Sequence, residues 1–561
     1  MAKQPLHTII GILLVLFSLG TIIWGFDKAF DFSDAGYYVL RYQDAQPVEF
    51  GGHMYEHILL RSLLPTAMRR LIPLRFLGLL INLLATTYLA SSIYLVLSYR
   101  RSKAISFPFI FLAAFSGFIA SYAGSPSELS YNSLNQFLLT LFAASMLLAT
   151  AGKERYHTLF SAISAIPLAF ILAVKLPTAL GGLLLGSVVL LCSKQHKLRS
   201  LLAFILAWLG TATLLNLLIQ PGMIAYYGNF YHYLSKYIIY DTKLLVKSLM
   251  DIAKLNLYAM LQALVVLLLA RITLLTGNKG MKLTASLAAL GMLLYVTATG
   301  LYSHLQGEML LSGFLLFYVY LSIGYLLLPP SLHLSTTAKA VPSFLRDNYL
   351  YIILIGMLLY LPYLGALGSS NPLNWGAKYY YSLLLGGFSL LLGLFYPAKA
   401  IRYAAYIMLY VLFFGLFQYV QHPYRSQPLY MQNNAYKGIK YDFPKWAFLT
   451  QTEGILSRYG FTPQQGIIAV YKHPGLVYAL GSFEPGTVLW SRETEDLYFA
   501  ILAKSDTPSK PVLLSLAGEL KQEFIHKLEL ALNVKFTRDY RLVASYPSYN
   551  KGDMVFLYTP R

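Results

Sequence analysis

Long apolar runs recur over the first three-quarters of the chain and are separated by short polar segments. A helix that crosses a membrane needs about 20 such residues. The pattern predicts thirteen spans, near residues 8–26, 71–98, 104–121, 132–151, 158–174, 177–193, 200–219, 256–275, 283–302, 309–328, 349–367, 379–396 and 402–420. The fifth and sixth spans are short and adjacent, which leaves one broken or re-entrant unit as an alternative. The expected fold class is a polytopic α-helical membrane protein.

After Gln421 the pattern becomes that of a soluble domain. The segments that alternate or run apolar over a few residues predict strands, and the longer amphipathic segments predict helices. The strands are expected at 466–472, 475–481 and 510–516, the helices at 492–505 and 518–532, and a hairpin at 540–560 that turns at Asn550, Lys551 and Gly552. We therefore expect a membrane domain over residues 1–420 and an α/β domain over residues 421–561.

Basic residues gather in alternate loops between the spans. Five short loops, YRRSK, GKER, SKQHKLR, GNKGMK and YPAKAIR, are basic, whereas the loops between them hold almost no Lys or Arg. Cytoplasmic loops carry this excess of positive charge. The N-terminus is therefore expected in the cytoplasm, and an odd number of spans places the C-terminal domain outside.

Two of the expected external segments are long. Residues 27–70 have helix-forming character. Residues 220–255 mix tyrosines and lysines with aliphatic residues, which is typical of an amphipathic helix that lies in the membrane interface.

Composition supports this class and excludes others. The chain is 57% hydrophobic and 12% charged, against roughly a quarter charged in soluble domains. Its net charge is +20, but residues 431–561 hold only 15 Lys/Arg against 12 Asp/Glu. Most of the excess positive charge therefore lies in short loops. There it indicates how the chain is oriented in the membrane and does not indicate a nucleic-acid partner. The single cysteine, Cys192, excludes a disulfide framework.

Four acids, Asp27, Asp31, Asp34 and Asp44, follow the first span. A helix that begins at Ser33 would place Asp34, Tyr37, Tyr38 and Arg41 on one face, because their spacing is i, i+3, i+4 and i+7. There is also a purely structural interpretation. Ser33 or Asp34 is an ordinary N-cap, and tyrosines are routine anchors at a membrane boundary.

With this loop, a polar second external loop, thirteen spans and an external α/β domain, the chain resembles the GT-C superfamily of integral membrane glycosyltransferases. The likeness is to the branch of protein O-mannosyltransferases and aminoarabinose transferases, with the oligosaccharyltransferase catalytic subunit more distant. Those families carry an Asp, often within Asp-Glu, in the first external loop, followed by Tyr and Arg. The string SDAGYYVLR matches with Asp34, Tyr37, Tyr38 and Arg41, but Ala35 stands where the second acid is usual.

Three more residues fit the resemblance. Glu128 is the acid of the second external loop, Lys175 lies at the expected external end of a span, and Arg425 follows the last span. A boundary lysine needs a partner, and a lipid phosphate would serve; the alternative is a side chain that extends to the interface. Arg425 suits bidentate binding of a phosphate, although an arginine at this place is more often an anchor.

The resemblance implies a transfer of sugar from a polyprenyl phosphate to an external acceptor, which is a lipid, a glycan or a protein. Asp34 would be the general base, while Lys175, Arg41 and Arg425 would bind the departing phosphate. Tyr37 and Tyr38 would pack on the sugar or prenyl group. The expected location is a bacterial-type plasma membrane, and the C-terminal domain is expected to cap the membrane cavity and to help recognise the acceptor.

One motif suggests different chemistry. The string HMYEH is a His-x-x-Glu-His pattern, which on a helix places His53 and His57 on one face with Glu56 between them. No third distant ligand stands out, so a metalloprotease is disfavoured, and the polar face of a loop helix is the simpler interpretation. A divalent metal accessory to the transferase stays open, since Ala35 breaks the acidic pair.

The main non-enzymatic alternative is a multi-pass transporter or lipid flippase. Such proteins commonly show internal repeats and broken helices at the membrane midplane, and the sequence shows neither clearly. Its charged residues gather at the expected external boundaries. A transporter also has little need of a long helical first loop and an external C-terminal domain.

Overall fold

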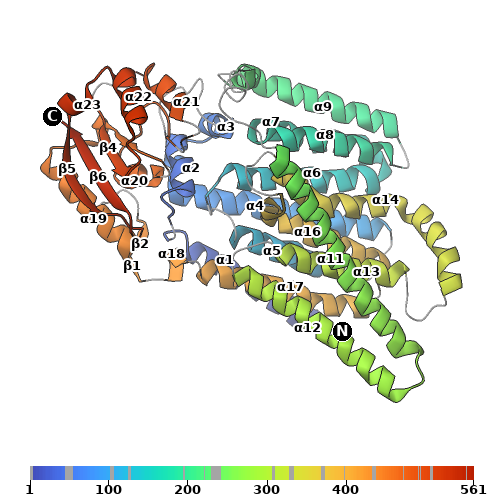
Figure 1. The fold of residues 1–561 in the computed structure, drawn as a ribbon. Helices are drawn as coiled ribbons and strands as arrows, with labels where there is room; N and C mark the ends of the chain where they lie inside the picture. The colour runs from blue at the N-terminus through green and yellow to red at the C-terminus, as the bar shows by residue number, and fades with distance from the viewer. Residues whose placement is uncertain are drawn as a thin grey trace.

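A long helical bundle carries a small domain of strands and short helices at one end (Figure 1). The computed structural model describes residues 4–28, 30–43, 55–100, 106–123, 128–193, 196–219, 222–228, 242–305, 310–327, 334–367, 373–396, 398–421, 423–426, 428–431, 438–471, 473–489, 492, 495–505, 510–550 and 552–561.

The bundle contains thirteen helices within the described ranges. They are α1 (Gln4–Trp24), α4 (Leu71–Tyr99), α5 (Phe107–Ala123), α6 (Tyr131–Ala151), α7 (His157–Val174), α8 (Leu176–Leu191), α9 (Lys197–Leu218), α11 (Thr242–Leu275), α12 (Lys279–Leu305), α13 (Leu310–Leu327), α14 (Leu334–Ala366), α16 (Tyr381–Phe395) and α17 (Ala398–Gln421). Eight candidate spans are long and apolar enough to cross a membrane, and four shorter apolar helices accompany them. Each predicted span falls on one helix, and the predicted fold class, a multi-pass α-helical membrane protein, is confirmed.

The fifth and sixth predicted spans are two separate helices, α7 and α8, with Lys175 alone between them. Lys175 has an extended backbone, and Pro177 lies in the first turn of α8, where its missing N–H costs no hydrogen bond. The chain therefore breaks at Lys175, at the end of the bundle that carries α2 (Asp34–Gln43) (Figure 1).

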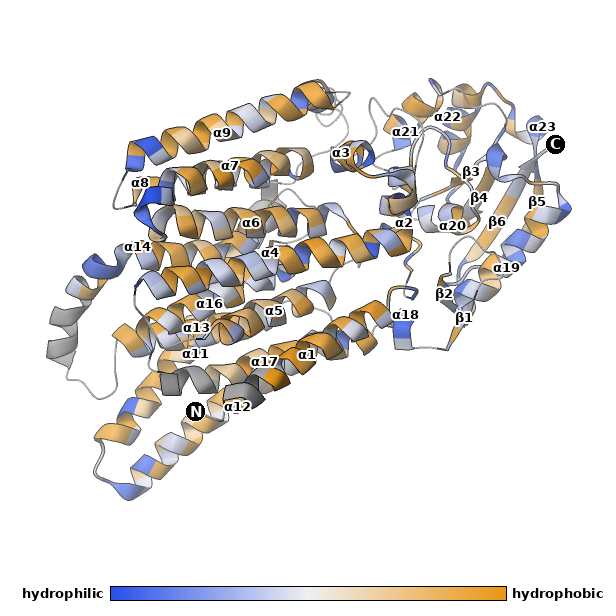
Figure 2. Cartoon of the chain, turned by 180° about the vertical axis from the view of Figure 1, so that it is seen from behind, coloured by the Kyte–Doolittle hydropathy of each residue, from blue (hydrophilic) through white to orange (hydrophobic). Residues whose placement is uncertain are grey.

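Glycine allows the bundle helices to approach closely. A Cβ atom on Gly117 of α5 would lie 2.4 Å from the carbonyl oxygen of Tyr381, and one on Gly415 of α17 would lie 2.9 Å from Cα of Ala120. Apolar residues line the bundle helices, and polar residues gather at the tip of the α11–α12 pair (Figure 2).

The C-terminal domain is built on a four-stranded sheet of order β3-β4-β6-β5. Its strands are β3 (Ile467–Ala469), β4 (Val512–Leu516), β5 (Tyr540–Pro547) and β6 (Met554–Pro560), and a small antiparallel pair joins β1 (Leu429–Met431) to β2 (Lys440–Asp442). The strands β3 and β4 are parallel, whereas β6 is antiparallel to both β4 and β5. Its helices are α19 (Phe443–Arg458), α20 (Pro474–Ala479), α21 (Glu495–Leu502), α22 (Gln522–Leu532) and α23 (Phe536–Asp539), while α18 (Pro423–Ser426) links the domain to the bundle.

Most predicted elements of this domain are confirmed, including the strands at 466–472 and 510–516, both helices and the hairpin. The predicted strand at 475–481 is wrong, because residues 474–479 form α20. Pro474 occupies the first turn of α20 and His473 its N-cap position. Proline fixes φ near the helical value, and this outweighs the apolar pattern.

The two long segments also differ in part from expectation. Residues 27–70 contain α2, α3 (Glu56–Leu63) and the short 3₁₀ helix η1 (Thr66–Arg69), so their helical character is confirmed. In the other segment residues 223–228 are helical, residues 229–241 lie outside the described ranges, and residues 242–255 are already part of α11. That span therefore begins earlier than its hydrophobicity indicates.

We expect Gly117→Ala to destabilise the bundle by about 1–3 kcal/mol, because its methyl group would overlap the backbone of α16. The measurement is thermal unfolding of the purified protein in detergent. The control is Gly210→Ala on α9, where a Cβ meets nothing within 4 Å. Equal stability of the two variants would contradict the close α5–α16 packing.

Candidate active site

The site begins at the turn that precedes α2, and Asp31 organises this turn. Its Oδ1 accepts a hydrogen bond from the backbone N–H of Ser33 (3.2 Å), and its Oδ2 accepts one from that of Asp34 (2.9 Å). Asp31 also binds the Ser33 hydroxyl, and its carbonyl accepts the N–H of Gly36. These contacts satisfy donors that a helix N-terminus leaves open. The capping role considered for Ser33 or Asp34 therefore falls to Asp31, and Asp34 is exposed.

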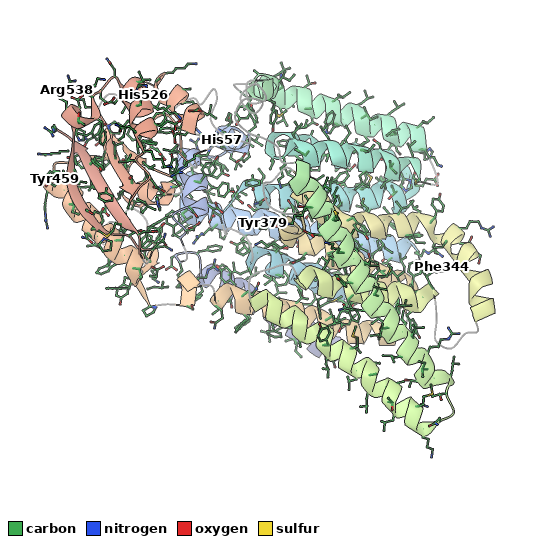
Figure 3. The ribbon with its side chains drawn as sticks, in the orientation of Figure 1. His57, Phe344, Tyr379, Tyr459, His526 and Arg538 are labelled. Atoms are coloured by element: carbon green, nitrogen blue, oxygen red, sulfur yellow. The ribbon has the colours of Figure 1, made fainter. Side chains whose placement is uncertain are left out.

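Tyrosines from other elements lie near Asp34. Its carboxylate interacts electrostatically with Tyr131, the first residue of α6, and with Tyr379 in the 3₁₀ helix η3 (Ala377–Tyr380). The ring of Tyr38 lies 5.9 Å from that of Tyr131. Figure 3 places Tyr379 towards the end of the bundle that carries α2. Sequence reasoning missed Tyr131 and Tyr379, because only the fold brings them to α2.

Tyr131 is held by the local chemistry of the α6 N-terminus. Ser130 and Ser133 form a capping box in which the Ser133 hydroxyl accepts the backbone N–H of Ser130 at 2.7 Å. This arrangement fixes the direction in which α6 begins. The string SELSYNS contains the two serines and could have indicated the helix start.

Lys175 lies behind Tyr131. Its ammonium is 5.4 Å from the centre of the Tyr131 ring and donates a 2.9 Å hydrogen bond to the carbonyl of Gly365, in the last turn of α14. That carbonyl also accepts hydrogen bonds from Asn135 and from the Tyr380 hydroxyl. A cation is favourable at a helix C-terminus. Lys175 is only 3% exposed, so its predicted alternative role, extension to the interface, is wrong.

Arg41 and Tyr37 belong to a second cluster, formed with the start of α3. One nitrogen of Arg41, Nη1, donates to the Tyr37 hydroxyl at 3.0 Å, and the other, Nη2, lies 2.8 Å from Nε2 of His57. Arg41, Glu56 and His57 are all buried, and His57 lies between the C-terminal domain and the bundle (Figure 3). Burial raises the pKa of Glu56 to about 7, although nearby Arg41 acts in the opposite direction.

The two clusters adjoin. Burial raises the pKa of the Tyr38 hydroxyl well above its usual range, and the charges of Tyr131, Asp34 and Glu56 add to this effect. Tyr38 therefore interacts electrostatically with a carboxylate of each cluster, Asp34 and Glu56.

The two metal candidates that the structure describes, Glu56 and His57, are not joined by a third ligand from the described residues. His53 lies outside the described residues, and the His57 ring is occupied by the guanidinium of Arg41. Among the residues that the structure describes, no three His, Cys, Asp or Glu side chains lie close enough to hold a metal ion. We therefore assign no step to a metal.

Glu128 and Arg425 lie in a third cluster, around Arg75 of α4. Glu128 is fully buried and its Oε2 is 3.5 Å from Nε of Arg75. Burial raises the pKa of Glu128, and Arg75 opposes this shift. Arg75 also donates hydrogen bonds to the carbonyls of Phe26 (2.8 Å) and Lys28 (2.6 Å), so it ties α4 to the chain that follows α1.

Arg425 of α18 stacks on Tyr419, with its guanidinium carbon 3.7 Å from the ring centre, and donates to the Tyr419 carbonyl at 3.1 Å. Its charge interacts with those of Arg75 and Glu128, while Glu128 interacts in turn with Asp31 and Asp34. Sequence reasoning missed Asp31 and Arg75, although an arginine inside an apolar run is a recognisable signal.

Some solved structures align with this chain at low identity, whereas no family model and no curated protein matches the sequence. An oligosaccharyltransferase of Archaeoglobus fulgidus, crystallised with Zn and sulfate, aligns over 98% of this chain and 73% of its own, with 14% identity and a TM-score of 0.45. ArnT of Cupriavidus metallidurans, bound to undecaprenyl phosphate, aligns over 97% of both chains, with 11% identity and a TM-score of 0.40.

We expect Glu56→Gln to change how stability depends on pH. The pKa of Glu56 in the folded protein, about 7, lies above its usual 4.5. The stability linked to its protonation is thus complete below pH 4.5 and is lost as the pH rises through 7. The variant should exceed the wild type by on the order of 2 kcal/mol at pH 8 and match it at pH 4.

The measurement is thermal unfolding of the purified protein from pH 4 to pH 8. The control is Glu523→Gln on α22, whose carboxylate is 78% exposed. If the pH profile of Glu56→Gln overlays that of the wild type, the pKa of Glu56 is the same in the folded and unfolded states and the prediction is wrong.

Proposed function

We propose that this protein is a glycosyltransferase that moves a sugar from a polyprenyl-phosphate donor to an external acceptor, with Asp34 as the general base. In the step, Asp34 takes the proton of an acceptor hydroxyl or phosphate and the acceptor oxygen bonds to the anomeric carbon. The bond between that carbon and the phosphate oxygen breaks, and polyprenyl phosphate leaves with the electron pair. The new bond forms on the opposite face, so the configuration inverts.

One observation carries this proposal. Asp34 is exposed on the first turn of α2, while the capping that would give it an ordinary structural role is performed by Asp31. A general base must reach the proton that it removes, and an exposed carboxylate among tyrosines of three elements suits that task. Tyr38, Tyr131 and Tyr379 interact electrostatically with Asp34, and we assign these aromatic and hydroxyl groups to contacts with the sugar.

Lys175 is the strongest candidate for the phosphate. It is a buried cation beside Tyr131, and its hydrogen bond goes to a carbonyl. No carboxylate among the described residues pairs with it, and burial lowers the pKa of its ammonium to about 7. A phosphate beside Lys175 would favour the charged form, which could then stabilise the departing phosphate. Arg41 and Arg425 are already engaged by His57 and Tyr419. Their positive charges would act on the phosphate at longer range, and their contacts would stabilise the residues around the site.

The proposal places the α2 end of the bundle and the C-terminal domain outside a bacterial-type plasma membrane. Helix α6 begins at the α2 end, where Tyr131 lies beside Tyr38. The basic residues Lys153 and Arg155 that follow α6 therefore lie at its other end. The positive-inside rule requires this for the proposed orientation. The tip of the α11–α12 pair, which carries Lys279 and Lys282, would then face the cytoplasm (Figure 2).

We expect Asp34→Asn to lower donor turnover by at least about a hundredfold, because it removes the proton acceptor and keeps the shape. The assay follows the release of polyprenyl phosphate from a panel of polyprenyl-phosphate sugars by protein in lipid, with membrane extract as acceptor. The control is Asp347→Asn, an exposed carboxylate on α14. Turnover of the variant at the wild-type rate would overturn the role of Asp34, and no turnover of any donor by the wild type would favour transport.

We expect Lys175→Met to raise the KM for the donor by at least about tenfold with a smaller effect on the binding of the acceptor, since the lost charge faces the phosphate. The measurement is steady-state kinetics with the donor that the panel identifies. Lys254→Met on α11 removes an exposed cation and serves as the control. An unchanged KM in a folded Lys175→Met protein would remove Lys175 from the phosphate site.

A further inference from the structure

The C-terminal domain packs directly on the turn that carries Asp34. The backbone N–H of Gly475, in α20, donates a 2.7 Å hydrogen bond to the carbonyl of Phe32. A Cβ atom on Gly36 would lie 2.1 Å from Cα of Gly475. No side chain fits between α2 and α20, so at this place the two domains meet backbone to backbone.

Aromatic side chains surround this contact. Phe32 lies 5.1 Å from Tyr549 and 5.9 Å from Tyr441, and Phe30 lies 5.5 Å from Tyr478, measured between ring centres. Phe30 and Phe32 are almost completely buried. The segment before α2 therefore belongs to the core of the C-terminal domain as much as to the membrane bundle.

Charged groups on both sides continue the contact. The backbone N–H of Lys440 donates to the carbonyl of Asp27 at 2.6 Å, and the Lys440 ammonium lies 2.8 Å from the Asp27 carboxylate. Lys445 of α19 and His473 both interact electrostatically with Asp31, the residue that caps α2. The C-terminal domain thus contacts the turn before α2 and also interacts with Asp31, which caps the helix.

The length of α2 shows why this contact is needed. Helix α2 has ten residues, whereas isolated helices shorter than about 12–15 residues are marginal in water. Packing against other elements must therefore supply its stability. The described structure provides that packing through α20 on one side and α3 on the other.

We propose that the C-terminal domain positions the catalytic turn: α20, through Gly475 and Phe32, holds Asp31 and α2 so that the Asp34 carboxylate faces Tyr131 and Tyr379. This inference rests on the proposed function for its catalytic consequence. The C-terminal domain then has a role beyond recognition of the acceptor. Without the contact to α20, the turn would lose its orientation whichever acceptor is bound. Gly475 and Phe32 are positioning residues, since neither contacts the reacting atoms.

The test is Gly475→Ala, whose Cβ would lie 2.5 Å from Cα of Phe32 and 2.9 Å from the Phe32 carbonyl oxygen. The matched control is Gly454→Ala on α19 of the same domain, where a Cβ meets nothing within 4 Å. Two readouts are needed: amide hydrogen exchange of the peptide that covers residues 30–43, and steady-state kinetics with the donor.

We expect the amides of α2 to exchange at least about tenfold faster in Gly475→Ala, because the helix opens locally. We expect kcat to fall at least about tenfold, since a displaced base loses its productive geometry. The KM for the donor should stay within about twofold, because Lys175 lies in the bundle and keeps its contacts. Gly454→Ala should match the wild type in both readouts.

A folded Gly475→Ala protein with wild-type exchange in α2 and wild-type kcat would overturn the proposal. If Gly475→Ala does not fold, Lys440→Met provides the second test, because it removes only the partly exposed ion pair with Asp27. We expect amide exchange in α2 to become faster in this variant too. Unchanged exchange in Lys440→Met would also overturn the proposal. If the wild type consumes no donor while exchange in α2 still rises in Gly475→Ala, the proposed function fails and the mechanical coupling stands.

Discussion

The meeting of two backbones at Gly36 and Gly475 is the constraint on which the candidate site depends. It leaves no room for a side chain and joins α2, an element too short to persist alone, to α20 of the C-terminal domain. The Asp31 cap, the aromatic cluster and the orientation of Asp34 all follow from this approach. Because interiors are close-packed and shift in discrete steps, the turn has one well-defined place.

A second constraint fixes the site from the side of the bundle. The Gly365 carbonyl at the end of α14 accepts three donors, from Asn135, Lys175 and Tyr380. These donors come from α6, from the break between α7 and α8, and from η3. A single acceptor thus gathers the ends of four elements behind Tyr131. Buried polar groups require such partners, and here the requirement also places a cation beside the candidate site.

Hydrophobic runs were sufficient to predict the bundle, because most of its helices are predominantly apolar, although Arg75 lies inside α4. The strands and helices of the C-terminal domain were also readable, except for residues 475–481, where Pro474 decides for a helix against an apolar pattern. Asp34 and Tyr38 could be chosen from the sequence because their spacing places them on one face of a helix in the first external segment, and Lys175 because it lies at the end of a predicted span. Their shared neighbours Tyr131 and Tyr379 could not be, because their proximity arises only from how α6 and η3 pack. The roles of Asp31 and Gly475 likewise depend on a contact between residues far apart in the chain.

The distance in sequence between Phe32 and Gly475 has a consequence for biosynthesis. A ribosome that adds ~5–20 residues per second makes α20 roughly 20–90 seconds after the turn at Phe32, its partner, has been made. During that interval α2 has only the bundle to pack on, and its carboxylate has no fixed direction. A chain that stops short of Gly475 would insert its helices into the membrane and still lack an ordered site. Only molecules in which the C-terminal domain is complete would therefore have an ordered site.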